Sequence, residues 1–239
     1  MTTSGSTGFT PEFTEIAEEA YERAGREMRS GYDLRTARRS MNLLTIEWAN
    51  RGINMWTIEQ GTKNLVQGTA TYTLPNDTID LLEHVIRTGA GNASTQADLT
   101  LTRISVSTYA TIPNKLAQAR PIQIYIQRNS GQTYPATSAY SPGATANPSF
   151  TVWPVPDQGT EASPYYQVVY WRMRRIQDAG AGIQTPDMTF RFYPCLMAGL
   201  AYYIAQKIPE GQERLQFLRA EYEQQMTYAT GEDREKAAV

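Results

Sequence analysis

The sequence contains very few of the residues on which most catalytic sites depend. Among 239 residues it has one cysteine, Cys195, and one histidine, His84. A single cysteine excludes an intramolecular disulfide and any metal site built on several cysteines, and we interpret Cys195 as a small apolar packing residue. Histidine is the usual general base near neutral pH. Because His84 alternates with apolar residues within 81–86, we interpret it as a structural or surface residue of a strand.

Sequence motifs for catalysis are also missing. There is no Gly-x-Ser-x-Gly nucleophile turn, no glycine-rich phosphate loop followed by Lys-Ser or Lys-Thr, and no set of three metal ligands at a recognised spacing. Asp77, Asp80 and Glu83 are candidates for the paired carboxylates of a glycosidase. However, 74–77 is typical of a strand ending in a turn, where Asn76 and Asp77 cap their own backbone. We predict a protein that is not an enzyme and uses no cofactor or metal.

Two further absences concern charge and long apolar runs. Lys and Arg number 22 and Asp and Glu number 24, which gives a net charge of -2, whereas a dedicated nucleic-acid binder normally carries a clear basic excess. No run of about 18 apolar residues is present, so we expect no membrane span. Residues 1–8 lack the basic start and apolar centre of a secretory signal, and we expect residues 1–9 to form a flexible arm.

The part of the sequence that does carry a strong pattern begins with two amphipathic helices in residues 10–52. The first is predicted over 10–30, with Thr10 as N-cap and Pro11 at the first helical position. The second is predicted to start near Asp33 and to end at 50–52, where Gly52 can take the left-handed conformation. We expect an antiparallel hairpin that needs a third element to cover its apolar stripes. The stripes are Phe13, Ile16, Ala17, Ala20, Tyr21 and Ala24, then Leu34, Ala37, Met41, Leu44 and Trp48.

Residues 53–180 have the composition of a β-rich domain, because Thr, Tyr, Val and Ile are common while Gly, Pro and Asn recur at short intervals. The clearest strand is 122–127, with three isoleucines facing one way, and 165–172 is bulky on both faces, as in a sandwiched or interface strand. A helical turn capped by Ser107 is predicted within 104–113, and 128–149 is predicted to be a long exposed loop. The remaining predicted strands are 54–59, 64–67, 70–74, 81–87, 99–103 and 149–154.

The segment 181–230 returns to a helical pattern. We predict that its two helices pack on the N-terminal hairpin. The expected fold class is therefore α+β, a layer of about four helices from both chain ends with an inserted antiparallel β domain and a tail at 231–239. The apolar stripes of these helices are Leu196, Met197, Leu200, Ala201, Ile204 and Ala205, then Leu215, Leu218, Tyr222, Met226 and Ala229.

A basic cluster follows Trp171 at the end of the strand at 165–172. Arginines beside an aromatic ring can bind phosphate or stack on bases. Asp178 and Asp187 are near in sequence and available to pair, so we favour an ion-pair or intersubunit role. The cluster consists of Arg172, Arg174 and Arg175, and a second, similarly ambiguous cluster consists of Arg35, Arg38 and Arg39.

Seven segments, spread over nearly the whole chain, carry a family likeness. They are 43–56 (LLTIEWANRGINMW), 68–75 (GTATYTLP), 101–105 (LTRIS), 152–157 (VWPVPD), 170–180 (YWRMRRIQDAG), 186–205 (PDMTFRFYPCLMAGLAYYIA) and 232–237 (EDREKA). Together they resemble the head-to-tail adaptor proteins of tailed bacteriophages, the ring that docks beneath the portal.

The resemblance implies a structural protein of the virion tail or neck, made in the host cytoplasm. It implies a helical layer against the portal and a β domain facing the tail, in a ring of twelve copies around a DNA channel. The implied partners are the portal protein, the next tail protein (nozzle or tail tube) and further copies of the chain, with no membrane. Double-stranded DNA would pass through the channel without specific binding, which suits a weakly acidic chain.

Candidate contact residues follow from this interpretation. Residues 231–239 are the candidate portal-docking segment, and 128–149 is a candidate for tail or neighbour contact. Two alternatives remain open. One is a tail-associated carbohydrate-binding or glycan-hydrolysing component that uses Asp77 or Glu83, and the other is a single-strand nucleic-acid module built on Trp171 and its arginines. The candidate residues are Asp233, Arg234, Glu235 and Lys236 for the portal, and Tyr134, Tyr140, Trp171, Arg172, Arg174 and Arg175 for subunit or tail contacts.

Overall fold

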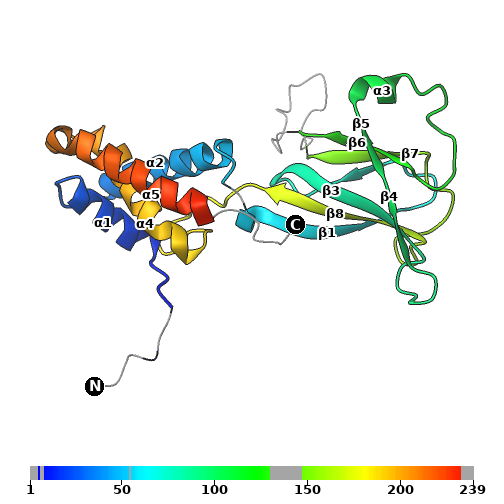
Figure 1. Cartoon of the computed structure of the whole chain (residues 1–239), viewed down its shortest axis with the longest axis horizontal. Coiled ribbons are helices and arrows are strands. Elements are labelled where there is room, and N and C mark those ends of the chain that lie inside the picture. Colours follow the sequence, from blue (N-terminus) through cyan, green and yellow to red (C-terminus); the bar gives the residue numbers. More distant parts are fainter. Residues whose placement is uncertain (1–4, 6–7, 54, 130–146, 233–239) are drawn as a thin grey trace. The chain divides into compact units, whose positions relative to one another are not determined.

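The computed structural model describes residue 5 and residues 8–53, 55–129 and 147–232. The chain divides into two compact units (Figure 1). The helical unit combines Met1–Trp56 with Ile176–Val239, and the β unit is Thr57–Arg175. The helical unit is thus made from both ends of the chain with the β unit inserted between them, and the predicted α+β class is confirmed.

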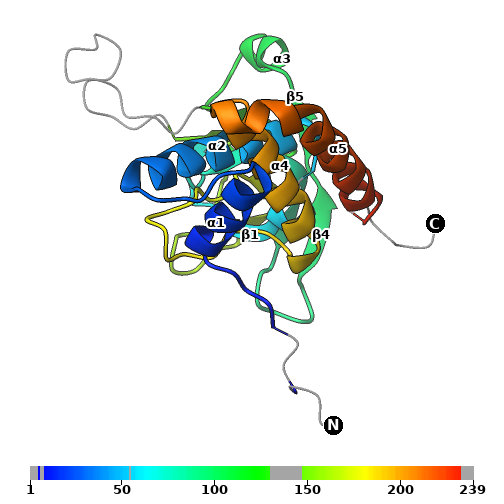
Figure 2. The same cartoon turned by 90° about the vertical axis from the view of Figure 1, so that its left-hand side faces the viewer.

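The helical unit is formed by α1 (Phe13–Arg23), α2 (Gly31–Asn50), α4 (Tyr193–Ala205) and α5 (Leu215–Glu232). α4 packs against each of the other three helices (Figure 2). A helix that is apolar on most of its surface is buried on most of its surface, and Leu196, Leu200 and Ile204 of α4 are all fully buried. α4 therefore supplies the third element that the stripes of α1 and α2 require. The α1 stripe is buried throughout, and the α2 stripe is buried except for the half-buried Leu34.

The close approach of α4 to its neighbours depends on Gly199. A Cβ atom at this position would lie 2.8 Å from Cε2 of Tyr222 on α5 and 3.0 Å from Cδ2 of Leu44 on α2. Beside this contact, Nε1 of the buried Trp48 donates to the hydroxyl of Tyr222 at 3.1 Å. The bond gives the buried indole N–H the partner it needs, and it joins α2 directly to α5.

The start and end of the first helix differ from the prediction. α1 begins at Phe13 with Glu12 as N-cap, in a capping box with Glu15, and it ends at Arg23 rather than near residue 30. Thr10 and Pro11 therefore precede the helix. The reciprocal bonds of a capping box satisfy two amide groups that would otherwise lack partners at the helix start, which explains why the helix begins after these residues.

The second helix also begins earlier than predicted. Ser30 is the N-cap of α2, and Asp33 completes the capping box at the third helical position. Oγ of Ser30 accepts the amide of Asp33 at 3.3 Å, while the carboxylate of Asp33 accepts the amide of Ser30 at 3.2 Å. Although burial opposes it, hydrogen bonds from Ser30 and the Arg29 backbone hold the pKa of Asp33 below its usual value. The predicted end is confirmed, because Gly52 has a φ of 81°.

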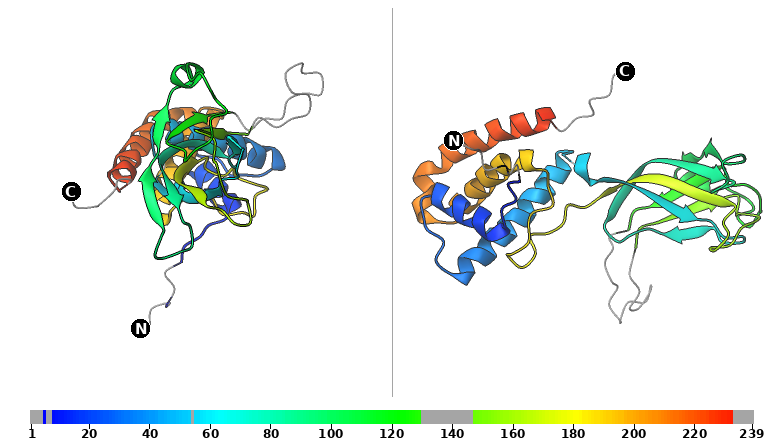
Figure 3. Two further views of the ribbon diagram at one scale, coloured as in Figure 1. Left: turned by 90° about the vertical axis from the view of Figure 1, so that its right-hand side faces the viewer. Right: turned by 90° about the horizontal axis from the view of Figure 1, so that it is seen from below.

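The β unit contains β1 (Ile58–Asn64), β2 (Thr71–Thr73), β3 (Thr78–Thr88), β4 (Ala97–Thr100), β5 (Thr102–Ile104), β6 (Gln123–Gln127), β7 (Ser149–Trp153) and β8 (Tyr166–Arg174), with the short helix α3 (Val106–Ala110) after β5. Among its described residues, the strands form one sheet of order β1-β8-β3-β4 and a second of order β2-β7-β6-β5 (Figure 3). Neighbouring strands are antiparallel except β5 and β6, which are parallel.

The two sheets share one apolar core. Val168 and Tyr170 of β8 belong to it together with Ile124 of β6 and Phe150 of β7. The ring of Tyr170 also lies over Gly61 of β1, where a Cβ atom would come within 2.6 Å of the ring. The predicted strand at 165–172 is thus sandwiched on its inner face.

Two strand predictions in the first sheet need correction. The predicted strands 54–59 and 64–67 are replaced by the single strand β1 at 58–64. Its sequence, IEQGTKN, lacks apolar alternation because Tyr170 of the neighbouring strand covers the inner position at Gly61. The predicted strand 99–103 is two strands, since the buried Leu101 separates β4 in one sheet from β5 in the other.

Two smaller corrections concern the second sheet and its loops. Ile122 precedes β6 and is exposed, whereas Ile124 and Ile126 are buried as predicted. The helical turn α3 is capped by Ser105 rather than Ser107, because Oγ of Ser105 accepts the amide of Thr108 at 3.2 Å. Most of the predicted loop at 128–149 lies outside the described residues.

Candidate interaction surfaces

The arginine cluster at the end of β8 is engaged within the β unit. Arg172 donates to Oδ1 of Asp77 at 2.6 Å, to Oγ1 of Thr78 at 2.9 Å and to Oε2 of Glu59 at 2.8 Å. Arg174 donates to the other oxygen of Glu59. The side chains of Arg172 and Arg174 are only 12% and 11% exposed. These two arginines therefore stabilise one end of the first sheet instead of offering their guanidinium groups to a ligand.

Glu59 binds both arginines at once. The hydrogen bond from Arg174 lowers the pKa of Glu59, burial opposes this, and the bond from Arg172 adds to the lowering. The partners of Arg172 come from β1 and from the turn before β3, whereas proximity in sequence suggested Asp178 or Asp187. Strand pairing, which the sequence pattern does not reveal, brings these carboxylates to Arg172.

Trp171 lies on the opposite face of the same sheet. Successive residues of a strand point to opposite faces, so Trp171 points away from the core that Tyr170 enters, and 36% of it is exposed. The register places it beside Gln60 of β1 and Glu83 of β3. Trp171 is thus separated from Arg172 by the thickness of the sheet, and the two do not form one nucleic-acid contact. Arg175, just after the strand, is exposed.

The carboxylates considered for glycan hydrolysis do not converge on one site. Asp77 is bound by Arg172, and Asp80 is bound by Arg103 at 2.9 Å. Glu83 lies on the outer face of the first sheet, in register with Trp171. A pair of catalytic carboxylates must flank one glycosidic bond, and these three side chains are not arranged in that way.

The single histidine and the single cysteine both occupy interior positions. His84 is half-buried on β3, and burial, with a contribution from Arg103, lowers its pKa. Cys195 is buried on α4, and burial raises the pKa of its thiol to about 12, which is the property of an unreactive packing residue. In the described ranges, no group of three or more His, Cys, Asp or Glu side chains is placed to hold a metal ion. No described helix is long and apolar enough to cross a membrane.

Several candidate residues lie outside the described residues. These are Asp233, Arg234, Glu235 and Lys236 of the candidate portal-docking segment, and Tyr134 and Tyr140 of the loop at 128–149. The last described helix, α5, ends at Glu232, immediately before the first of these groups. Their roles remain predictions from the sequence.

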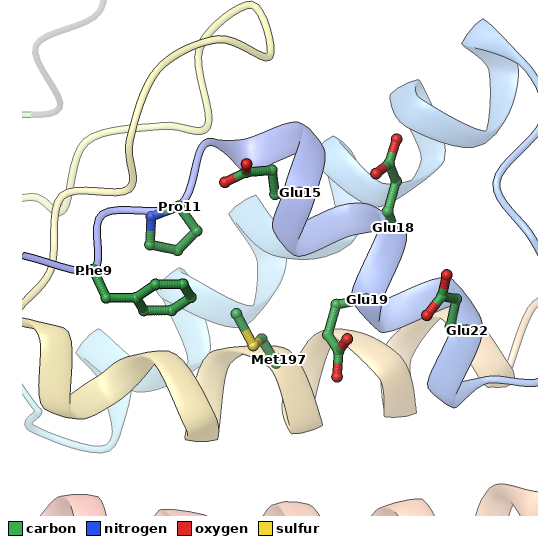
Figure 4. A pocket seen from close by; sticks show the side chains of 7 residues that line it. All are labelled: Phe9, Pro11, Glu15, Glu18, Glu19, Glu22 and Met197. Carbon is green, nitrogen blue, oxygen red and sulfur yellow. The ribbon is translucent and has the colours of Figure 1, made fainter. Parts of the chain in front are cut away.

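The helical unit carries an open groove of about 420 Å³ beside α1 (Figure 4). Phe9, which packs edge-to-face on Tyr193, and Met197 of α4 give it an apolar floor. We call it the acidic groove, because four glutamates of α1, together with Pro11, complete its lining. These glutamates are Glu15, Glu18, Glu19 and Glu22.

The glutamates of the acidic groove differ in their partners. Glu19 pairs with Arg23 at 2.7 Å, and Glu15 accepts the amide of Glu12 at 3.0 Å. Glu18 and Glu22 are exposed and pair with no cation among the residues that the structure describes. The groove therefore has an excess of negative charge.

α2 presents the opposite charge on its exposed side. Arg35, Arg38 and Arg39 are exposed, and no described carboxylate pairs with any of them. Arg38 donates to the carbonyl of Gly180 at 3.3 Å, and Arg39 donates to the hydroxyl of Thr36 at 3.4 Å. We call this the basic face of α2. Large exposed apolar residues lie along the same helix: Tyr32, Leu43 and Ile46.

The chain is thus an α+β protein that carries an acidic groove and a basic helix face on its helical unit. The chain belongs to the SU10 adaptor protein family, whose family model matches residues 14–239. This is a family of phage head-to-tail adaptors, so the family likeness seen in the sequence is confirmed. A structural adaptor family implies a non-enzymatic role. No curated protein matches the chain.

Proposed function

We propose that the chain is a ring subunit of the phage neck, which seats on the portal, extends the DNA channel and offers a docking surface to the next tail protein. The observation that carries this proposal is the family match, because it covers residues 14–239 and so includes both units. The proposed partners are the portal protein, a nozzle or tail-tube protein and further copies of the chain, in a ring of twelve.

The surfaces of the chain support this role. A subunit of a closed ring needs two different contact surfaces, because a head-to-tail contact repeats around the circle until it closes. The acidic groove and the basic face of α2 are two such surfaces on the helical unit. On the β unit, the exposed ring of Trp171 suits a protein contact, since large aromatic side chains are enriched at interfaces.

The overall charge also supports a channel role. The net charge of the chain is -2, and a channel that lets DNA slide through should not neutralise many phosphates, because each neutralised phosphate strengthens binding. Passage of double-stranded DNA without specific binding is therefore part of the proposal. A filter-binding assay at low salt should detect at most weak binding of duplex DNA to the isolated chain.

The direct test is the oligomeric mass of the chain with and without purified portal rings, measured by native mass spectrometry or mass photometry. We expect discrete complexes in which several copies, twelve when saturated, occupy one portal ring. A chain that never associates with portal rings at any ratio would overturn the proposal.

The portal-docking segment is tested separately. We expect deletion of residues 231–239 to abolish co-sedimentation with portal rings, while the circular dichroism of the chain stays unchanged. A companion variant with alanine at Asp233, Arg234, Glu235 and Lys236 separates the charged contacts from the length of the segment. Unchanged binding of both variants to portal rings would show that another surface of the chain docks on the portal.

A further inference from the structure

We propose that the basic face of α2 of one subunit binds in the acidic groove of the next, so that this pair of surfaces is the contact between neighbouring copies. The inference rests on the proposed ring function and adds to it the surfaces that meet. The occupant of the groove is thus a second copy of this chain, and its binding elements are the arginines of α2.

Charge complementarity within one chain is the first argument. The acidic groove carries Glu18 and Glu22 without a described cation, and the basic face carries Arg35 and Arg38 without a described carboxylate. Arginine and carboxylate form the strongest charged hydrogen bonds available to side chains, often with two parallel bonds. A second copy supplies partners of the right sign to both surfaces at once.

The chemistry of the groove is the second argument. Phe9 and Met197 form its apolar floor, and glutamates of α1, with Glu19 next to Met197, line the rest of it (Figure 4). An arginine side chain has an apolar stem and a charged end, and it can lay the stem on apolar surface while the end stays polar. A volume of about 420 Å³ accommodates such a side chain. The exposed Leu43 and Ile46 of α2 add apolar area beside the arginines.

The arrangement of the helices is the third argument. α1 and α2 each pack on α4, and in the view into the groove α2 runs behind α1 and α4 (Figure 4). Within one subunit, no described ion pair joins Arg35 or Arg38 to Glu18 or Glu22. A head-to-tail series of subunits can bring the two surfaces together between neighbouring copies.

The test uses paired charge reversals. The acid-reversed variant is Glu18→Arg with Glu22→Arg, and the base-reversed variant is Arg35→Glu with Arg38→Glu. None of these four residues takes part in a described ion pair, so each variant should keep the far-ultraviolet circular dichroism and the unfolding midpoint of the unaltered chain. The readout is the number of copies bound per portal ring as a function of subunit concentration.

We expect each variant alone to need on the order of 100-fold higher concentration than the unaltered chain, because every contact then joins like charges. An equimolar mixture should recover assembly, since the reversed groove of one variant matches the reversed helix of the other. Such a mixed ring alternates the two variants and closes only with an even number of copies. The variant with all four substitutions should also assemble.

A matched control changes the same amount of charge elsewhere. Glu210→Arg with Glu213→Arg alters two exposed glutamates of the turn before α5, and it should load portal rings like the unaltered chain. Normal loading by both reversed variants, or failure of their mixture, would overturn the proposed contact while leaving the ring function in place. Failure of the unaltered chain to load portal rings would instead overturn the ring function itself.

Discussion

The two units use their charged side chains differently. In the β unit, Arg172 is held by Asp77 and Glu59, and Arg87 by Asp98 at 2.7 Å. The helical unit has internal pairs as well, such as Arg23 with Glu19 and Glu221. It also carries, on α1 and on α2, exposed charges that no described residue of opposite sign contacts. In the β unit, Arg172 and Arg87 therefore stabilise its own fold, while α1 and α2 of the helical unit carry exposed charges without a described partner of opposite sign.

The largest effect that separates the two units should come from Trp48→Ala. Removing this fully buried side chain should cost about 3–5 kcal/mol of stability, as is typical of Trp truncation in a core. It also removes the hydrogen bond to Tyr222. Hydrogen exchange followed by mass spectrometry should show faster exchange in α2, α4 and α5, with β1 to β8 unchanged.

A matched control truncates a tryptophan that is partly exposed on the β unit. Trp171→Ala removes a ring that is 36% exposed, and it should change the stability by no more than about 1 kcal/mol. If Trp48→Ala instead lowered hydrogen-exchange protection equally in both units, the two units would unfold together. Their stabilities would then not be separable.

The next effect should come from Arg172→Ala in the β unit. The change leaves Glu59 and Asp77 without their shared partner, and bonds to charged groups of this kind are worth about 1–3 kcal/mol once the partial exposure of the two carboxylates is allowed for. Urea unfolding followed by tyrosine and tryptophan fluorescence measures the loss. Arg172→Lys keeps the charge but not the fork that spans two carboxylates. Its free energy of unfolding should therefore lie between that of the unaltered chain and that of Arg172→Ala. An alanine variant as stable as the unaltered chain would contradict the structural role of the cluster.

A pH effect of smaller size is expected from His84. Burial lowers its pKa in the folded chain below the ordinary 6.5, so the unfolded chain takes up a proton at higher pH than the folded chain does. The free energy of unfolding should therefore fall as the pH drops below about 6.5, by at most about 1.4 kcal/mol for each pH unit, until the lowered pKa is reached. Unfolding curves between pH 7 and pH 5 measure this slope. Since His84→Gln cannot take up the proton, its slope should be flatter, and equal slopes would assign the pH dependence to other groups.

The smallest effect on stability is expected on the basic face of α2. Arg35→Ala with Arg38→Ala should change the free energy of unfolding by no more than about 0.5 kcal/mol, because exposed side chains without a described ion pair contribute little to a fold. Thermal unfolding by circular dichroism gives the value. A loss as large as that of Arg172→Ala would mean that these arginines serve the helical unit itself, and the contrast with the β unit would disappear.

The helices were predictable because their pattern is local. Phe13, Ile16 and Tyr21 recur at helical spacing, and all three are buried in α1. The caps were less predictable, since Ser30 and Asp33 are both good cap residues and only the reciprocal bonds between them decide which is the N-cap. An amphipathic stripe thus predicts which face of a helix is buried more reliably than it predicts the residue at which the helix begins.

The β unit was harder to predict because its pattern depends on neighbours distant in sequence. β1 has no apolar alternation, and its central position, Gly61, makes sense only once Tyr170 of β8 lies over it. The ion pairs of Arg172 with Glu59 and Asp77 have the same origin, since strand pairing brings these residues together. The surface charges of α1 and α2 were visible in the sequence, but their lack of internal partners became clear only from the folded chain.

The hydrogen bond from Trp48 to Tyr222 joins residues 174 positions apart, and this separation has a consequence for synthesis on the ribosome. The β unit occupies one continuous stretch, Thr57–Arg175, whereas the helical unit needs α4 and α5 from the end of the chain. We expect the β unit to fold first, while α1 and α2 remain without the helices that bury their stripes. In a chain stalled at residue 205, protease should cut within 10–52 and spare the strands. A subunit would then gain both of its proposed contact surfaces only when translation is nearly finished, which would keep incomplete chains out of a ring.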